Sequence, residues 1–201
     1  MESISPEFPM PIITDRLIIR PTQITDGKML HEAIIESFDE LHRYMKWCKN
    51  INTVSESETY VREAVDNWIL KKNDEPYLQL IILDKNTNNF IGATSFHHYD
   101  WEIPATETGY WVQQSKSGHG YITEAINAIT QYAFKQLNVK RISLTCDPDN
   151  IKSKKIAERL GYTLEGRLKN HRMKPEDGTV GDTLIYARYD LNNLPKLLVK
   201  W

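Results

Sequence analysis

Two glycines stand where a predicted strand ends and a predicted helix begins, in the segment VQQSKSGHGYITEAINAITQYAF (residues 112–134). Gly118 and Gly120 leave main-chain N–H groups uncovered just before the helix, which begins near Gly120. The first N–H groups of a helix have no partner within it, and the helix dipole makes that end positive. The arrangement therefore predicts a site for an anionic group such as a pyrophosphate. A plain turn, which glycine also favours, is the alternative.

The spacing matches neither of two common phosphate loops. A P-loop needs G-x-x-x-x-G-K-[ST], whereas these glycines are too close together and no Gly-Lys follows. A dinucleotide-binding loop needs G-x-G-x-x-G, and Thr123 stands where the third glycine should be. What remains is a strand, a short glycine loop and a helix N-terminus.

The elements around this loop predict an α/β (α+β) fold. Apolar residues recur at helical spacing from Gly120 to Leu137, namely at Ile122, Ala125, Ile126, Ile129, Ala133 and Leu137. A Ser-x-x-Glu pattern at Ser55 predicts the start of an earlier helix. Strands are predicted over 12–20, 77–84, 89–98, 106–113, 140–147, 162–170 and 182–190, and other helices over 25–47 and 150–161. One mixed sheet flanked by helices fits this order.

Length and composition predict a single domain over residues 1–201, with a tail of open role at 192–201. The chain is 40% hydrophobic and 26% charged, which suits a globular protein with a full core. No apolar run approaches the ~20 residues of a membrane helix, and the opening segment lacks the regions of a secretory signal. Cys48 and Cys146 lack metal-ligand spacing, so we expect no metal, free thiols and a cytoplasmic location.

Charge is divided unevenly along the chain. The net charge of −2 argues against direct nucleic-acid binding. Residues 1–107 carry 18 acidic against 10 basic side chains, and residues 108–201 carry 9 against 15. The division could reflect two unrelated solvated surfaces, or a site where the second half meets an anionic ligand and the first half a cationic one.

Four further motifs stand along the chain: GYW (109–111), GHGYITEA (118–125), DPDN-x-x-S (147–153) and RLGYTLEG (159–166). Together they resemble the GNAT acetyltransferases, and more narrowly the ribosomal-protein N-terminal (Rim-type) group. The similarity runs from about Thr14 to Leu191. It implies a mixed, mostly antiparallel sheet of about seven strands, which opens as a splay between the strand carrying GYWVQ and the strand RISLTC.

The resemblance also implies acetyl-CoA as co-substrate, with its pantetheine arm in the splay and its pyrophosphate on the glycine loop. The implied cofactor-binding residues are Val112, Gln114, Gly118, His119, Gly120, Tyr121, Ile122, Thr123, Asn150 and Ser153. The chain departs from the family loop at Ser117, which lacks a long donor, and at Ile122, which is bulky. We expect the Ile122 side chain to turn into the core, because it lies on the apolar helix face.

The resemblance places Ser153, one turn after Asn150, near the expected position of the CoA sulfur. Asn150 is expected to bind the pantetheine arm or to cap the following helix, with Asp149 as another possible cap. Many relatives carry a tyrosine acid on this helix, where this chain has Ala157. Ser153 is thus the predicted proton donor, unless it is simply an exposed helix serine.

Glu107 is the predicted base, acting through water. It shares a strand face with Gly109, at the border of the splay, although it could be a surface charge at a strand end. Another base position of Rim-type relatives falls near Arg172, which cannot serve as a base. His97, His98 and His171 are further candidates.

The expected acceptor is the α-amino group of a peptide or protein, such as a ribosomal protein. The segment FDELHRYMKW (38–47) resembles one wall of the Rim-type acceptor groove, and its aromatic residues could equally be core. A small amine such as a polyamine or aminoglycoside is the enzymatic alternative, and a regulatory domain that binds CoA without turnover is the other. No membrane partner is expected, and the protein could be a monomer or a homodimer.

Overall fold

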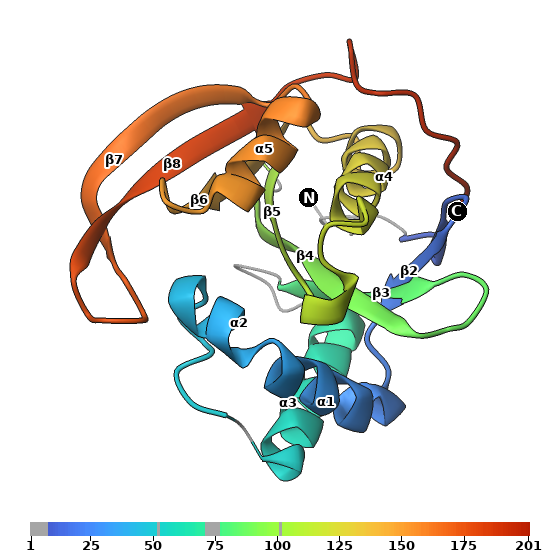
Figure 1. Ribbon diagram of the computed structural model, residues 1–201. Helices are drawn as coiled ribbons and strands as arrows, with labels where there is room; N and C mark the ends of the chain where they lie inside the picture. The colour runs from blue at the N-terminus through green and yellow to red at the C-terminus, as the bar shows by residue number, and fades with distance from the viewer. Residues whose placement is uncertain (1–7, 52, 71–76, 101) are drawn as a thin grey trace.

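Eight strands form one sheet in the order β1-β2-β3-β4-β5-β6-β8-β7 (Figure 1). The computed structural model describes residues 8–51, 53–70, 77–100 and 102–201. All neighbouring strands are antiparallel except β5 and β6, which are parallel. The strands are β1 (Ile12–Ile13), β2 (Leu17–Pro21), β3 (Leu78–Asp84), β4 (Phe90–Asp100), β5 (Ala105–Val112), β6 (Arg141–Cys146), β7 (Thr163–Met173) and β8 (Val180–Arg188).

The sheet has one strand more than the approximate seven expected. A single strand was predicted over 12–20, but it folds into the β1–β2 hairpin. The Thr14 N–H donates to the carbonyl of Leu17 at 3.0 Å, and the Leu17 N–H donates to Oγ1 of Thr14 at 2.9 Å. The threonine hydroxyl thus closes a turn inside an apolar run that otherwise reads as continuous strand.

The predicted splay is present between β5 and β6. These strands pair at three positions only, the last joining Glu107 to Ser143. Beyond it, β5 pairs with β4 alone and β6 with β8 alone. The mixed, mostly antiparallel, opened sheet predicted from the resemblance is therefore confirmed.

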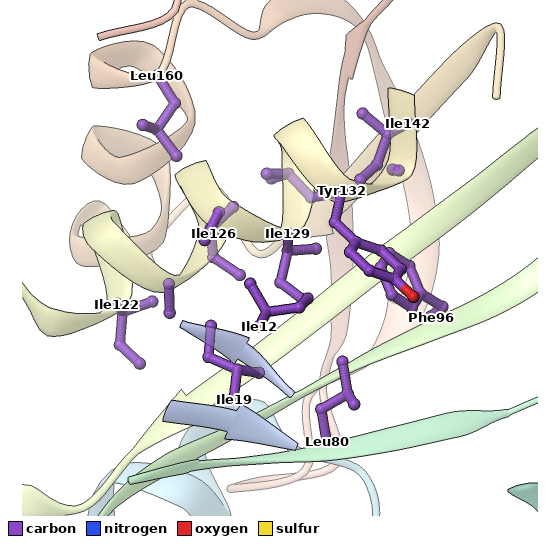
Figure 2. Packing of buried hydrophobic residues seen from close by; sticks show 14 of the residues in the cluster. Ile12, Ile19, Leu80, Phe96, Ile122, Ile126, Ile129, Tyr132, Ile142 and Leu160 are labelled. Atoms are coloured by element: carbon purple, nitrogen blue, oxygen red, sulfur yellow. The ribbon is translucent and has the colours of Figure 1, made fainter. Parts of the chain in front are cut away.

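Helices cover both faces of the sheet (Figure 1). The helices are α1 (Gly27–Glu36), α2 (Phe38–Tyr44), α3 (Val54–Leu70), α4 (Tyr121–Lys135) and α5 (Ile151–Arg159). The first three lie on one face and the last two on the other. The predicted apolar face of α4 is buried, and Figure 2 shows Ile122, Ile126 and Ile129 directed toward strand residues such as Ile12 and Ile19. Across the described ranges, no helix combines the length and apolarity needed to cross a membrane.

Thr53, not Ser55, caps α3. The Thr53 N–H and O–H donate to Oε2 of Glu56 at 2.6 and 2.9 Å, and the Glu56 N–H donates back to Oγ1 of Thr53 at 3.2 Å. This reciprocal pair is a capping box. The predicted motif was correct in kind but two residues late, because T-x-x-E and S-x-x-E overlap here.

The C-terminal tail runs over α4 and ends beside β1 (Figure 1). Main-chain hydrogen bonds of 2.7 and 2.9 Å join Ile13 and Lys200. The ring of Trp201 packs edge-on against Tyr132, with centroids 5.8 Å apart, and Lys135 lies over its face. These contacts give the tail a structural role that its sequence left open.

We expect Trp201→Ala to lower the free energy of unfolding by about 1–2 kcal/mol, because it removes an aromatic pair and a cation–π contact. The melting temperature should fall by about 2–8 °C for a domain of this size. Leu198→Ala is the control, since Leu198 is 66% exposed. Equal melting temperatures for the two variants would show that the tryptophan contact adds no stability.

Candidate active site

A cleft of about 930 Å³ opens where β5 and β6 diverge. Its walls come from α2, β4, β5, the loop before α4, α5 and the β7–β8 arm. All the predicted cofactor residues line it except His119. The carbonyl of His119 instead accepts a hydrogen bond from Arg16 at 3.1 Å. The gap in the sheet is thus continuous with a cavity large enough for an extended ligand.

The glycine loop presents a row of unpaired N–H groups. Gly118 and Gly120 have φ values of 83° and 79°, in the left-handed region that favours glycine. Gly120 directly precedes α4, which no side chain caps. Within the described part of the chain, none of the N–H groups from 118 to 123 has a hydrogen-bond acceptor. The loop therefore meets the chemical requirement for binding a diphosphate.

The side chain of Arg16, in the β1–β2 turn, contacts both this loop and the start of α4. Its Nε donates to Oε2 of Glu124 at 2.6 Å, and its guanidinium lies 4.7 Å from the ring centroid of Tyr121. With the bond to His119, one side chain fixes both the loop and the first turn of α4. No local sequence pattern indicates this role, because Arg16 and Glu124 are 108 residues apart.

We expect Arg16→Met to weaken CoA binding by about threefold to tenfold, because the loop loses two oriented hydrogen bonds. The effect is modest since the Arg16 side chain is 46% exposed. Calorimetric titration with CoA measures it, with Arg62→Met on the exposed side of α3 as control. Equal affinities in the two variants would mean that the loop keeps its shape without Arg16.

The edge of β5 supplies main-chain groups to the gap. The Gln113 N–H donates to the carbonyl of Ile91 on β4 at 2.9 Å. Strand alternation then turns the N–H and C=O of Val112 toward the opposite edge, where β6 has moved away. Gln114 differs, because its N–H donates to Oγ of Ser37 at 2.9 Å and its C=O accepts from Ser117. The main-chain groups of Gln114, an implied cofactor-binding residue, are therefore already engaged within the protein.

Ser153 faces a tyrosine across the gap. Asn150 caps α5, since its Oδ1 accepts from the Ser153 N–H at 3.0 Å. Asp149 does not cap; it pairs with Nζ of Lys174 at 2.7 Å. The hydroxyl of Ser153 lies 2.8 Å from that of Tyr110 on β5. Ser153 is 7% exposed, so it is not a surface serine.

Tyr110 was not predicted as a site residue. Ala157 is buried at the position where many relatives carry a tyrosine, and Tyr110 brings a phenol to the same helix from the facing strand. Burial raises the pKa of Tyr110 strongly, against a smaller opposing effect of the bond to Ser153. The phenol therefore keeps its proton at neutral pH and can donate to Ser153. Strand alternation, which places Tyr110 on the face opposite Glu107, is the signal that could have revealed it.

Glu107 is held by one carboxylate oxygen. Its Oε1 lies 3.3 Å from Nε2 of His97 and accepts from the Thr145 hydroxyl at 2.9 Å. Nδ1 of His97 lies 3.1 Å from the hydroxyl of Ser95, so the imidazole is fixed at both nitrogens. Oε2 of Glu107 has no hydrogen-bond partner among the described residues. The carboxylate is thus oriented, with one oxygen free for a water or an amine.

The electrostatic environment keeps Glu107 ionised. Burial alone would raise the pKa of Glu107. The interaction with His97 and the Thr145 hydrogen bond outweigh burial, and the pKa lies below its ordinary value. At neutral pH Glu107 can accept a proton, although its low pKa makes it a weak base.

Arg172 ties the β7–β8 arm to the far wall of the cleft. Its Nη2 donates to the carbonyl of Tyr44, at the end of α2, over 2.7 Å. Its Nε lies 3.9 Å from Oδ2 of the buried Asp147. Of the other candidate bases, His97 joins Glu107, and His98 and His171 line the cleft.

Basic side chains gather around the glycine loop. The cleft lining includes Lys116, Lys155 and Arg159, and Arg159 donates to the Thr123 hydroxyl at 3.2 Å. Lys152 also lines the cleft but pairs with Glu40 at 3.3 Å. Cys48 and Cys146 are free, as expected. In the described ranges no cluster of His, Cys, Asp and Glu is suited to a metal ion.

The sequence matches a family described as Acetyltransferase (GNAT) domain over residues 16–163. The ribosomal-protein-serine acetyltransferase of Escherichia coli is 26% identical over 161 residues, covering 80% of this chain and 86% of the relative. The solved structure of the microcin C7 self immunity acetyltransferase MccE, in complex with acetyl-CoA and AMP, is 28% identical with a TM-score of 0.76. The match covers 88% of this chain and 93% of the MccE chain.

The α-N-protein acetyltransferase RimL, solved in complex with coenzyme A, shares the fold with a TM-score of 0.78 at 22% identity. That match covers 90% of this chain and 98% of the RimL chain. The opened sheet, the glycine loop at α4 and the matched family domain lead to one conclusion: the chain belongs to the GNAT acetyltransferase family.

Proposed function

We propose that the protein transfers the acetyl group of acetyl-CoA to the α-amino group of a peptide or protein. The observation that carries the proposal is the gap between β5 and β6, which joins the uncapped N-terminus of α4 in one cleft. The strand edge suits an extended pantetheine arm, and the loop N–H groups suit its diphosphate. The nearby Lys116, Lys155 and Arg159 would add positive charge for the phosphates.

Asn150 supports the same placement. Its Oδ1 is used for capping α5, but its Nδ2 makes no hydrogen bond with the described residues. The amide can therefore cap the helix and donate to the pantetheine arm at once. The two alternatives considered for Asn150 are compatible.

Bound acetyl-CoA supplies a thioester whose carbonyl carbon the amine attacks. Glu107, oriented by His97 and Thr145, would accept the amine proton through water at Oε2. The Val112 N–H faces the gap and would stabilise negative charge on the carbonyl oxygen. As the new C–N bond forms, the C–S bond breaks, and Ser153, held by Tyr110, would give a proton to the departing CoA thiolate.

The weak base favours an acceptor that is already partly neutral. An α-amine has a pKa of about 8, against about 10.4 for lysine. At pH 7 roughly one α-amine in ten is neutral, but only about one lysine side chain in a few thousand. The relatives named for ribosomal proteins support a protein N-terminus as acceptor.

Mass spectrometry of peptides incubated with acetyl-CoA tests the proposal. Acetylation at the N-terminus, with lysine side chains unmodified, is the expected result. Acetylation of polyamines or aminoglycosides, with no peptide acetylated, would show that the acceptor is a small amine. CoA binding without turnover of any amine would instead support a regulatory CoA-binding domain.

A further inference from the structure

A second cavity, of about 390 Å³, lies beside the cleft on the face covered by α1–α3. We call it the aromatic cavity, because its walls include Trp47, Tyr60, Tyr77 and Trp111. Three of these residues are substantially exposed although they surround one hollow: Trp47 is 47%, Tyr60 37% and Tyr77 41% exposed. Large aromatic residues that stay uncovered around one cavity indicate a binding site rather than core.

The described lining of the aromatic cavity carries no Asp, Glu, Lys or Arg. Most polar groups there are already paired. The Tyr60 hydroxyl donates to Gln79, Ser95 contacts His97, and the Thr94 hydroxyl donates to the carbonyl of Gly109. A cationic or anionic group placed there would lose its hydration without gaining a charged partner.

One polar atom in this lining has no partner. Ser57, on α3, is 1% exposed, and its hydroxyl makes no hydrogen bond with the described residues. A buried hydroxyl left unsatisfied costs stability.

The aromatic cavity meets the cleft beside the proposed base. Both include His97, Gly109 and Trp111 in their linings. A Cβ added at Gly109 would lie only 3.3 Å from Cε1 of His97, so the glycine keeps this junction open. A group in the aromatic cavity can therefore be attached to an amine that reaches Glu107.

We propose that the aromatic cavity binds an uncharged aromatic ring of the acceptor, attached close to the reacting amine. This inference rests on the proposed function and names its substrate class. The ring stacks among the tryptophans and tyrosines and leaves the amine at the junction beside Gly109. Polyamines and aminoglycosides, which carry additional charges, are poor acceptors.

Initial rates with arylalkylamines test the acceptor class. Tyramine, tryptamine and phenethylamine should each exceed putrescine and ethylamine by at least tenfold in kcat/KM, since one apolar group separates acceptors by about 10–200-fold. Two peptide substrates, one with tyrosine at the first position and one with tyrosine at the second, show which residue of a peptide acceptor provides the ring. Equal kcat/KM for charged and aromatic acceptors would overturn the proposal while leaving acetyl transfer intact.

Trp47→Ala tests the aromatic cavity without changing a catalytic group. We expect it to raise KM for tyramine by about tenfold or more, with the affinity for CoA unchanged. Tyr189→Ala is the matched control, because Tyr189 is a 50% exposed aromatic residue on the β8 side and lies outside the cavity lining. Equal KM values in the two variants would contradict the assignment.

Binding of N-acetyltyramine to the CoA-saturated protein, measured by calorimetry, needs no turnover. Failure of Trp47→Ala to weaken that binding would overturn the aromatic cavity whether or not the protein acetylates any amine.

Discussion

Gly120→Val should weaken CoA binding on the order of 100-fold. The φ of Gly120 is +79°, and a β-branched residue is strained there. Valine would shift the loop away from the left-handed conformation and misalign the N–H groups that precede α4. Losing two charge-assisted hydrogen bonds accounts for the size of the effect at the lower end of their range, about 1.5 kcal/mol each, because 1.4 kcal/mol is a tenfold change.

Gly178→Val is the control for strain alone. Gly178, in the loop between β7 and β8, has a φ of +70° and open space where a Cβ would lie. Both variants should lose similar stability on thermal unfolding, but only Gly120→Val should lose affinity in a calorimetric CoA titration. Unchanged affinity in Gly120→Val would reduce the loop to a simple turn.

Glu107→Gln should lower kcat by roughly 100-fold at pH 7, the lower end of what general base catalysis contributes. The affinity for CoA should not change. The pKa of Glu107 lies below its ordinary value of about 4.3, so the carboxylate is ionised at every pH of a practical assay. Any pH dependence of the defect must therefore come from other groups, chiefly the acceptor amine.

The acceptor amine sets the direction in which the Glu107→Gln defect changes with pH. As the pH falls below the amine pKa of about 8, more acceptor arrives protonated and proton removal in the site matters more. The ratio of wild-type to variant rates should thus rise toward acid and shrink to less than about tenfold near pH 9. Glu102→Gln, in the exposed β4–β5 turn, is the control. A ratio that stays constant with pH would remove Glu107 from proton transfer.

His97 provides a further check. If His97 acts by orienting Glu107, the double variant Glu107→Gln/His97→Gln should be no slower than Glu107→Gln alone, because residues that act as a unit are not additive. Multiplicative losses would show that the imidazole accepts a proton independently.

Local patterns in the sequence were sufficient for most of the fold. Helical spacing in α4 predicted the burial of Ile122, and the structure confirms it at 7% exposed. The two glycines before α4 predicted the unpaired N–H groups there. The splay followed only from the family resemblance, since nothing in the residues of β5 and β6 alone indicates where their pairing stops.

Contacts between distant segments could not be predicted in the same way. Arg16 reaches the glycine loop from a hairpin 103 residues away, and Tyr110 meets Ser153 across a gap that strand alternation alone does not locate. The pairing of His97 with Glu107 depends on a register that shifts between His97 and Asp100. Counting back from the turn would therefore give the wrong partner.

Backbone amide NMR during a CoA titration tests the central claim most directly. The account predicts the largest chemical-shift changes at the N–H groups of residues 118–123 and at the gap-facing N–H of Val112. Changes confined to the exposed lysines of α5, with the amides of the loop and β5 unmoved, would contradict it.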